Sequence, residues 1–327
     1  HSFPTRRSSD LKVIIGSVLV IVLLVGGLFG YGEWNRRKGE EANADAGERT
    51  QEDLYVTYQG KQYEYNHNLK NILFIGVDKL DEFTEQQVGK GGQSDALILL
   101  STNKEDKTTT LLEISRDSMT DVKTYDLNGE YLGKERAQIT IQYAYGDGEA
   151  ESCQLTKEAV SNLLYEIPIS SYLALSIEGV KELTDAVGGV QITVPEDYTE
   201  INPLFEKGAT LVLNGEQAEQ YVRKRDIDKT GSNNERMERQ SQFIEALVYQ
   251  LQGKDTSWYR QIFKEIEEYV VTDMSIDEME RLSGYEMKKP IEVVPGEVQA
   301  GEKHDEFIVD NQKLQEMIIK LFYKQKK

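Results

Sequence analysis

Short apolar runs alternate with longer amphipathic stretches over most of the chain. Runs of β-branched and aliphatic residues bounded by polar residues are typical of buried strands. The sequence therefore predicts strands over Asn71–Val77, Ala96–Leu100, Thr108–Ile114, Tyr172–Ile177 and Val190–Val194. Apolar residues spaced three and four apart predict helices over Leu155–Tyr165, Val180–Val187, Asn214–Arg225 and Asn234–Leu251.

These predicted strands and helices interleave, and the sequence contains no internal repeat. Such an order predicts an α/β body with a mixed central β-sheet flanked by helices, over residues 67–254. Residues 255–327 carry further helical patterns at Met274–Leu282 and Asp310–Phe322, around a strand-like stretch at Ile291–Val294. No Pro/Gly/Ser-rich linker precedes them, so we expect a C-terminal helical part packed on the same body.

Val13–Tyr31 is a run of 19 residues without a charge. At about 1.5 Å per residue it matches a bilayer core, and it is apolar on every face. We expect a single transmembrane helix over residues 12–32, because the run is too long for a cleaved signal peptide. The remaining mass follows this helix, which favours a single-pass protein of the cell membrane with an extracytoplasmic body. Residues 33–66 are then a tether. Residues 1–11 form an N-terminal tail of doubtful origin, because their sequence has no structural logic ahead of an apolar segment.

Composition narrows the function further. The 327 residues include 57 acidic and 38 basic side chains, a formal net charge of -19. This charge repels the phosphates of DNA and RNA, so we expect no nucleic-acid partner. A single cysteine, Cys153, excludes an internal disulfide and a cysteine-rich metal site. The three histidines have no metal-ligand spacing.

The local charge reverses between residues 223 and 239, which contain six basic residues. Arg236, Arg239 and Gln240 share one face near the start of a predicted helix, where free amides and the helix dipole attract anions. Guanidinium groups bind phosphate oxygens in two-pronged geometry, so a phosphate or pyrophosphate ligand is one interpretation. The other is a solvated helix face, because Glu235 and Glu238 are interleaved with the arginines.

Acidic residues stand at the ends of three predicted strands, namely Asp78, Asp95 and Asp117. Ligands in open α/β sheets bind near strand ends, and carboxylate oxygens suit magnesium that also contacts substrate phosphates. Taken singly, each aspartate is better explained as a turn or cap residue, and only the three together favour a ligand site.

These residues lie in motifs that resemble the LytR-CpsA-Psr family. The motifs occur in the family's order: NILFIGVD at 71–78, QSDALILLST at 93–102, LLEISRDSM at 111–119, AYGDG at 144–148, DAVGGVQITVP at 185–195, LNGEQAEQYVRKRD at 213–226 and ERMERQ at 235–240. The resemblance implies membrane-anchored transferases of Gram-positive-type bacteria. They move a glycopolymer, such as teichoic acid or capsule polysaccharide, from a polyprenyl-pyrophosphate carrier to peptidoglycan through a phosphodiester bond. A pyrophosphatase side activity is a further expectation.

The resemblance also implies roles for individual residues. Asp78 and Asp95 would hold magnesium and, with Arg116 and Asp117, form the catalytic group. The pyrophosphate would be bound by Arg116, Arg223, Arg225, Arg236 and Gln240, with Arg239 as a further candidate. The carrier's lipid chain needs an apolar cleft, and the helices around 155–164 and 243–251 are candidates to line it. For any single side chain of these helices, packing in the core is the stronger interpretation.

The chain departs from the family pattern at two positions. Gln93 and Gln138 stand where the family usually carries basic residues. Their loss of positive charge keeps a second interpretation open, a non-catalytic protein that binds polyprenyl phosphate or a cell-wall polymer. A transcription regulator is disfavoured by the acidic body, the predicted anchor and the lack of a basic helix-turn-helix.

Overall fold

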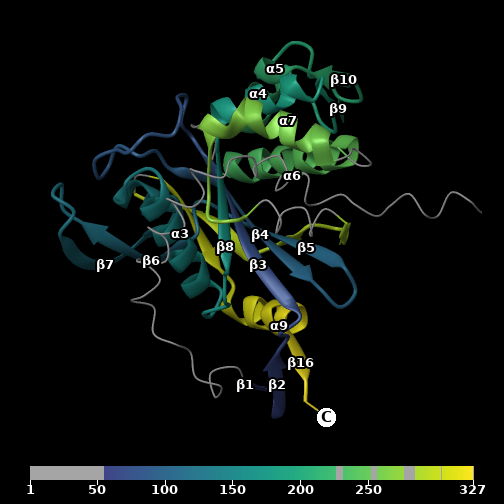
Figure 1. Cartoon of the computed structure of the whole chain (residues 1–327). Helices are drawn as coiled ribbons and strands as arrows, with labels where there is room; N and C mark the ends of the chain where they lie inside the picture. The colour runs from purple at the N-terminus through teal and green to yellow at the C-terminus, as the bar shows by residue number, and fades with distance from the viewer. Residues whose placement is uncertain (1–54, 226–230, 252–255, 276–283, 303, 327) are drawn as a thin grey trace, which may run out of the picture.

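The structure is a computed structural model that describes residues 55–225, 231–251, 256–275, 284–302 and 304–326 (Figure 1). The predicted tail, the predicted transmembrane helix and most of the predicted tether lie outside the described residues. Within the described part of the chain, no helix is both long enough and apolar enough to span a bilayer.

A seven-stranded sheet forms the centre of the molecule, in the order β11-β8-β3-β4-β5-β12, with β13 also paired to β5. Strand β3 runs antiparallel to β4 and parallel to β8, so the sheet is mixed, as predicted. Its strands are β3 (Leu69–Val77), β4 (Ser94–Asn103), β5 (Thr108–Ile114), β8 (Ser171–Ser176), β11 (Val270–Thr272), β12 (Glu286–Met287) and β13 (Glu292–Val293).

Both faces of the sheet are buried, which explains the unbroken apolar runs of the central strands. Along β3, Ile72 belongs to one hydrophobic cluster, whereas Leu73 and Ile75 belong to another on the opposite face. One face is covered by α4 (Ile177–Ala186), α5 (Gly215–Arg223), α6 (Ser232–Leu251) and α7 (Thr256–Ile266). The other is covered by η2 (Ile139–Tyr145), α3 (Ala150–Leu163) and α9 (Asn311–Phe322). A short 3-10 helix, η3 (Glu267–Tyr269), follows α7.

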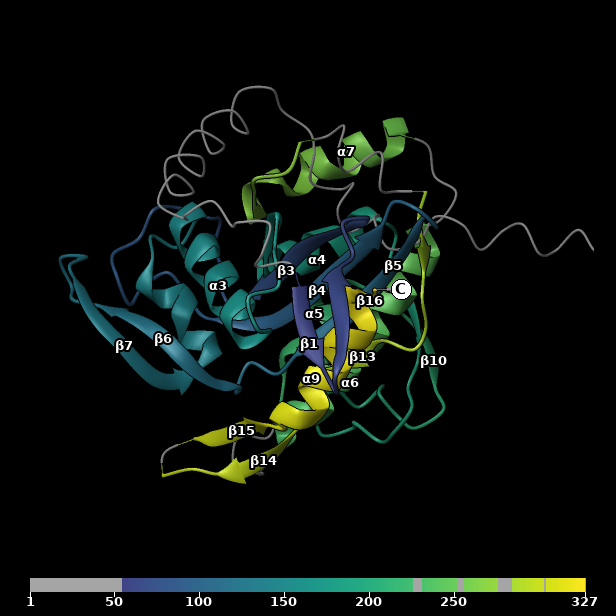
Figure 2. The same cartoon turned by 90° about the horizontal axis from the view of Figure 1, so that it is seen from below.

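The described residues also form four smaller sheets around this core. Two of them are hairpins that extend from the body in Figure 2, β6 (Met119–Tyr125) with β7 (Tyr131–Gln138) and β14 (Gly296–Ala300) with β15 (Asp305–Val309). The others are β9 (Val190–Thr193) with β10 (Thr210–Leu213), and β1 (Tyr55–Tyr58), β2 (Lys61–Tyr65) and β16 (Tyr323–Gln325).

The structure differs from the sequence prediction in the tether and in the C-terminal part. Residues 55–65, assigned to the tether, form β1 and β2, because β2 pairs with the distant strand β16. The C-terminal part is less helical than predicted, since β11 and β13 extend the central sheet and β14–β15 forms a hairpin. Long-range pairing of this kind leaves little local signal. Of the predicted helix at 274–282, Met274 and Ser275 are not helical and residues 276–283 lie outside the described part.

Candidate active site

The central sheet brings three of the predicted site residues to one edge. Asp78 directly follows β3, and Asp95 is the second residue of the antiparallel strand β4, whose Ser94 pairs with Val77. Arg116 follows β5, which also runs antiparallel to β4. Antiparallel register therefore places the end of β3, the start of β4 and the end of β5 together.

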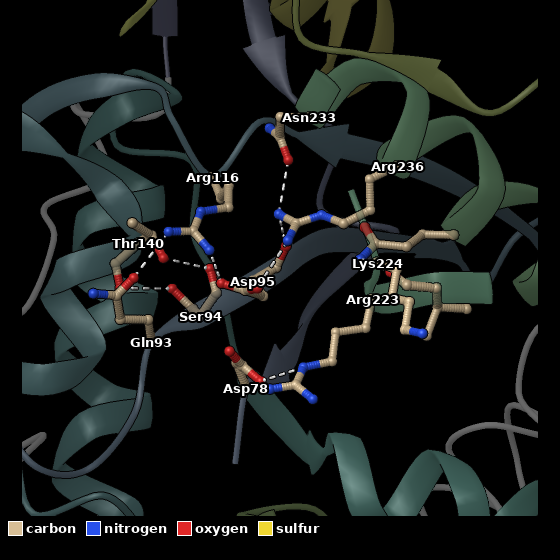
Figure 3. Close-up of polar contacts among 12 residues, drawn as sticks. Asp78, Gln93, Ser94, Asp95, Arg116, Thr140, Arg223, Lys224, Asn233 and Arg236 are labelled. Atoms are coloured by element: carbon tan, nitrogen blue, oxygen red, sulfur yellow. Dashed lines mark hydrogen bonds and ion pairs between the residues drawn. The ribbon is translucent and has the colours of Figure 1, made fainter. Parts of the chain in front are cut away.

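Helices α5 and α6 add arginines to the same edge. Figure 3 shows Arg116 and Arg236 converging on Asp95. The Nη1 atom of Arg116 pairs with one carboxylate oxygen of Asp95, and Nη1 of Arg236 donates to the other at 2.9 Å. Arg223, at the end of α5, pairs through Nε with Asp78 at 3.0 Å. The fold thus gathers guanidinium and carboxylate groups from distant parts of the chain.

Several of these paired side chains are buried, which makes their pairing important for stability. The Arg236 side chain is only 3% exposed, and desolvation lowers its pKa to about 10, although the charge of Asp95 opposes that change. Burial likewise raises the pKa of Asp117, against the lowering effect of Arg116, Arg225 and Arg236. A buried charge without its partner is costly, so each member of this group depends on the others.

Directly beneath these charged groups lies an apolar cavity of about 690 Å³ that includes its open mouth. Its wall is formed by one face of the sheet together with α4, α5 and α6. Asp78, Asp95, Arg223 and Gln240 are its charged and polar lining residues. The remaining lining residues are Phe74, Gly76, Val77, Ala96, Leu175, Ile177, Val180, Leu183, Val222, Phe243, Ile244 and Leu247.

Small residues form part of the cavity wall. A Cβ added at Gly76 would lie only 2.9 Å from Cβ of Ala96, so this part of the sheet has no room for a larger side chain without displacement. The cleft predicted from the helix at 243–251 is present. The helix at 155–164 does not line it, because α3 packs on the opposite face of the sheet, where its side chains have the core role that was the stronger interpretation.

Gln240 and Arg239, both predicted to bind phosphate, differ from each other in their contacts. Gln240 lines the cavity, and its Nε2 donates to the carbonyl of Val222 at 3.0 Å. Arg239 does not line the cavity. Its Nε donates to the carbonyl of Tyr221 at 2.8 Å, and its guanidinium lies 4.9 Å from the ring centre of Tyr198. Through these contacts, Arg239 joins α6 to the end of α5.

The two departures from the family pattern are hydrogen-bonded within the site. Gln93 accepts a hydrogen bond from Nη2 of Arg116 at 2.9 Å. Gln138 donates from Nε2 to a carboxylate oxygen of Asp117 at 3.0 Å. Both glutamines therefore orient charged residues of the group, in place of adding charge to it.

Two further residues belong to this network and were not predicted from the sequence. Asn233 accepts a hydrogen bond from Nη2 of Arg236 at 2.7 Å and donates to Ser115 at 3.2 Å. Its spacing of three residues from Arg236 on α6 was the available signal. Asp305 accepts a hydrogen bond from the amide of Gly231 at 2.8 Å, and nothing local in the sequence indicates this contact.

Asp78 and Asp95 are the carboxylates that line the cavity mouth. No cluster of three or more His, Cys, Asp or Glu side chains suited to a metal occurs within the described ranges. Magnesium commonly takes one or two carboxylates and completes its shell with water and substrate phosphates. The donor set fits a magnesium ion of that kind, bound together with its substrate.

Residues 29–322 match the model of the LytR_cpsA_psr family. The chain belongs to the LytR-CpsA-Psr family. The resemblance inferred from the motifs is therefore confirmed. Among LytR-CpsA-Psr relatives, "Polyisoprenyl-teichoic acid--peptidoglycan teichoic acid transferase TagU" of Enterococcus faecalis is 31% identical over 85% of this chain and 84% of its own length. TagV of Bacillus subtilis, which has the same activity name, is 29% identical over 85% of this chain and 69% of its own.

The crystal structure of B. subtilis TagV superposes with a TM-score of 0.59, at 25% identity. The superposition covers 78% of this chain and 96% of the TagV chain. The mixed sheet with helices on both faces is therefore the fold of LytR-CpsA-Psr proteins.

Proposed function

We propose that this protein transfers an anionic glycopolymer from a polyprenyl-pyrophosphate carrier to peptidoglycan through a phosphodiester bond. The observation that carries the proposal is the apolar cavity that opens beneath paired arginine and aspartate side chains. An apolar cavity suits a polyprenyl chain, and guanidinium groups suit the oxygens of a diphosphate. The names of the TagU and TagV relatives support a polyisoprenyl-linked teichoic acid as the donor.

The chemistry is a displacement at phosphorus. The oxygen of an acceptor sugar hydroxyl forms a bond to the phosphorus that carries the glycopolymer. The bond between this phosphorus and the bridging oxygen breaks, and that oxygen leaves as part of polyprenyl phosphate. Arg116, Arg223 and Arg225 offset the negative charge of the leaving phosphate.

The proton of the attacking hydroxyl must pass to a base within hydrogen-bond reach. Both oxygens of Asp95 accept from arginines, Arg116 and Arg236. The Asp78 side chain is 37% exposed and pairs with Arg223 through one oxygen. Asp78 therefore has the better access to an incoming hydroxyl, and we assign it the role of general base.

Asp78 and Asp95 would hold magnesium beside the diphosphate, through the carboxylate lone pairs that the arginines do not use. When bound, the ion would supply positive charge that stabilises the leaving phosphate. Water attacking in place of the sugar hydroxyl would give the pyrophosphatase side activity expected from the family.

The proposal places the body outside the cytoplasmic membrane, attached by the predicted helix at 12–32. A polyprenyl carrier lies in that membrane and peptidoglycan lies outside it, so an anchored extracytoplasmic body can reach both. Fractionation and protease accessibility of the body in intact cells would test this placement.

The test is transfer of polymer from a purified polyprenyl-pyrophosphate donor to peptidoglycan by the detergent-solubilised full chain. We expect transfer that requires magnesium and stops when EDTA is added. Asp95→Asn keeps the size of the side chain but removes its charge, and we expect it to reduce turnover at least about a hundredfold. Asp121→Asn, at an exposed position on β6, is the matched control and should leave turnover unchanged.

Retention of the donor without any transfer would refute the enzyme and favour a polymer-binding protein. Full turnover by Asp95→Asn would contradict the assignment of this carboxylate to the catalytic group.

A further inference from the structure

Strand β15, near the C-terminus, contacts the candidate active site through three hydrogen bonds. The amide of Phe307 donates to the carbonyl of Asp117 at 2.9 Å. The main-chain carbonyl of Asp305 accepts from Nε2 of Gln138 at 2.7 Å. The side-chain carboxylate of Asp305 accepts from the amide of Gly231 at 2.8 Å. One strand therefore joins three segments that are distant in the sequence.

These segments carry charged groups of the site. Asp117 lies in the turn after β5 that also presents Arg116. The same amide group of Gln138 that bonds Asp305 also bonds the carboxylate of Asp117. Gly231 directly precedes α6, the helix that carries Arg236.

The carboxylate of Asp305 also acts through its charge. It lies at the N-terminal end of α6, where the helix dipole favours a negative group. It thereby occupies the amide of Gly231, directly before α6, so this amide is not free to bind a substrate anion. In this arrangement the arginine side chains are the groups that bind phosphate, and Asp305 binds the start of α6.

We propose that Asp305 is a positioning residue of the phosphate site, which fixes the start of α6 relative to the turn of Arg116 and Asp117. This proposal rests on the proposed function, because it assumes that the arginines bind a diphosphate. Asp305 itself does not touch the substrate. Its hydrogen bond to Gly231 and its link through Gln138 set how far Arg236 lies from Arg116.

Two explanations of Asp305 give opposite results for a bound anion. If Asp305 acts only as a negative charge near the site, removing it strengthens anion binding. If it positions α6, removing its hydrogen bond weakens binding, and a neutral acceptor of the same shape restores it. Asp305→Ala and Asp305→Asn separate these cases, because asparagine keeps an oxygen that can accept from the Gly231 amide.

The experiment measures binding of inorganic pyrophosphate by calorimetry, with the detergent-solubilised full chain. We expect Asp305→Ala to bind about tenfold more weakly, the loss of roughly one hydrogen bond to a charged group. We expect Asp305→Asn to stay within about threefold of the unchanged protein, since it keeps the acceptor. Glu297→Gln, an exposed position on the paired strand β14, removes the same charge and should have no effect.

Equal or tighter binding by Asp305→Ala would overturn the proposal. If that variant does not fold, Gln138→Met removes the link between Asp305 and Asp117 and must also weaken binding, and unchanged affinity would overturn the proposal as well. Pyrophosphate binding does not require polymer transfer. A protein that binds pyrophosphate but transfers no polymer would therefore refute the proposed function alone.

Discussion

At the scale of single residues, the motif aspartates Asp78 and Asp95 differ in the ion pairs that they form. Asp95 neutralises two arginines, and one of them, Arg236, is almost fully buried. Asp95→Ala would leave that cation unpaired, at a cost of about 3–5 kcal/mol. Lost activity in this variant would mix folding with chemistry. Asparagine also removes the charge, but it keeps an oxygen that can accept from one of the arginines, so Asp95→Asn should cost less stability than Asp95→Ala.

Asp78 allows a cleaner separation of activity from stability. Its side chain is 37% exposed and pairs with Arg223, which is 36% exposed. Exposed pairs of this kind contribute about 0–1 kcal/mol to folding. We therefore predict that Asp78→Asn lowers turnover at least about a hundredfold while the free energy of unfolding changes by less than about 1 kcal/mol.

Turnover and urea unfolding of the same preparation check this prediction. Asp81→Asn, an exposed aspartate in the same loop, is the matched control and should change neither quantity. Normal turnover by Asp78→Asn would remove Asp78 from the role of general base.

At the scale of elements, the position of α6 depends on a buried acid in β5. Glu113 is 4% exposed, and its carboxylate accepts a hydrogen bond from Ser241 of α6 at 2.8 Å. Burial raises the pKa of Glu113 from its usual 4.5 to about 7, and the nearby charge of Glu238 adds to this effect. The carboxyl group is therefore protonated in the folded protein at pH values where it is ionised in the unfolded chain.

This contact predicts a pH dependence with a definite sign. The folded state binds the proton more tightly, so the contribution of Glu113 is fully present below about pH 4.5 and is lost as pH rises towards 7. Over that window the loss is about 3 kcal/mol at most. Glu113→Gln mimics the protonated form, so we predict that its stability exceeds that of the unchanged protein at pH 8 but not at pH 4.5.

Urea unfolding of both proteins at the two pH values measures this difference, because all other groups titrate alike in both. A stability difference that stays constant with pH would show that Glu113 does not titrate as its burial indicates.

At the scale of the whole molecule, the cavity exists only because four separate elements enclose it. The sheet supplies one wall, and α4, α5 and α6 supply the others. Arg223 and Gln240, which we propose bind phosphate, line this cavity together with apolar side chains, so the proposed site would hold the head and the tail of a lipid diphosphate by different groups. These two contributions can be separated by experiment.

Filling part of the cavity should weaken binding of the lipid tail without affecting binding of the phosphate head. Ile244 of α6 lines the cavity, and Ile244→Trp would occupy part of its volume. We predict at least about tenfold weaker binding of a polyprenyl phosphate, with unchanged binding of inorganic pyrophosphate. Calorimetry with each ligand in the same detergent measures both values.

Met317→Trp is the control, because Met317 is also half-buried but packs on the opposite face of the sheet. Both substitutions can cost about 1–3 kcal/mol by overpacking, so the comparison isolates the ligand effect. Equal loss of both ligands in Ile244→Trp would contradict the separation of head and tail.

The sequence by itself determined the central elements and the composition of the site. Apolar runs such as that of β3 are buried on both faces, which is why their pattern was readable from local residues. Ordered motifs in the chain identified the family, and they marked Asp78, Asp95 and Arg116 as candidates. Patterns among neighbouring residues, and the order of motifs along the chain, can be read without knowing which distant residues are in contact.

Only the tertiary structure decided which of these groups meet. Arg236 and Arg239 look equivalent in the sequence, but one pairs with Asp95 while the other binds backbone carbonyls at the end of α5. Asp305 joined the site through hydrogen bonds to residues far from it in the chain. Strand pairing and helix packing set such distances, and no local pattern encodes a contact whose partners lie tens of residues apart.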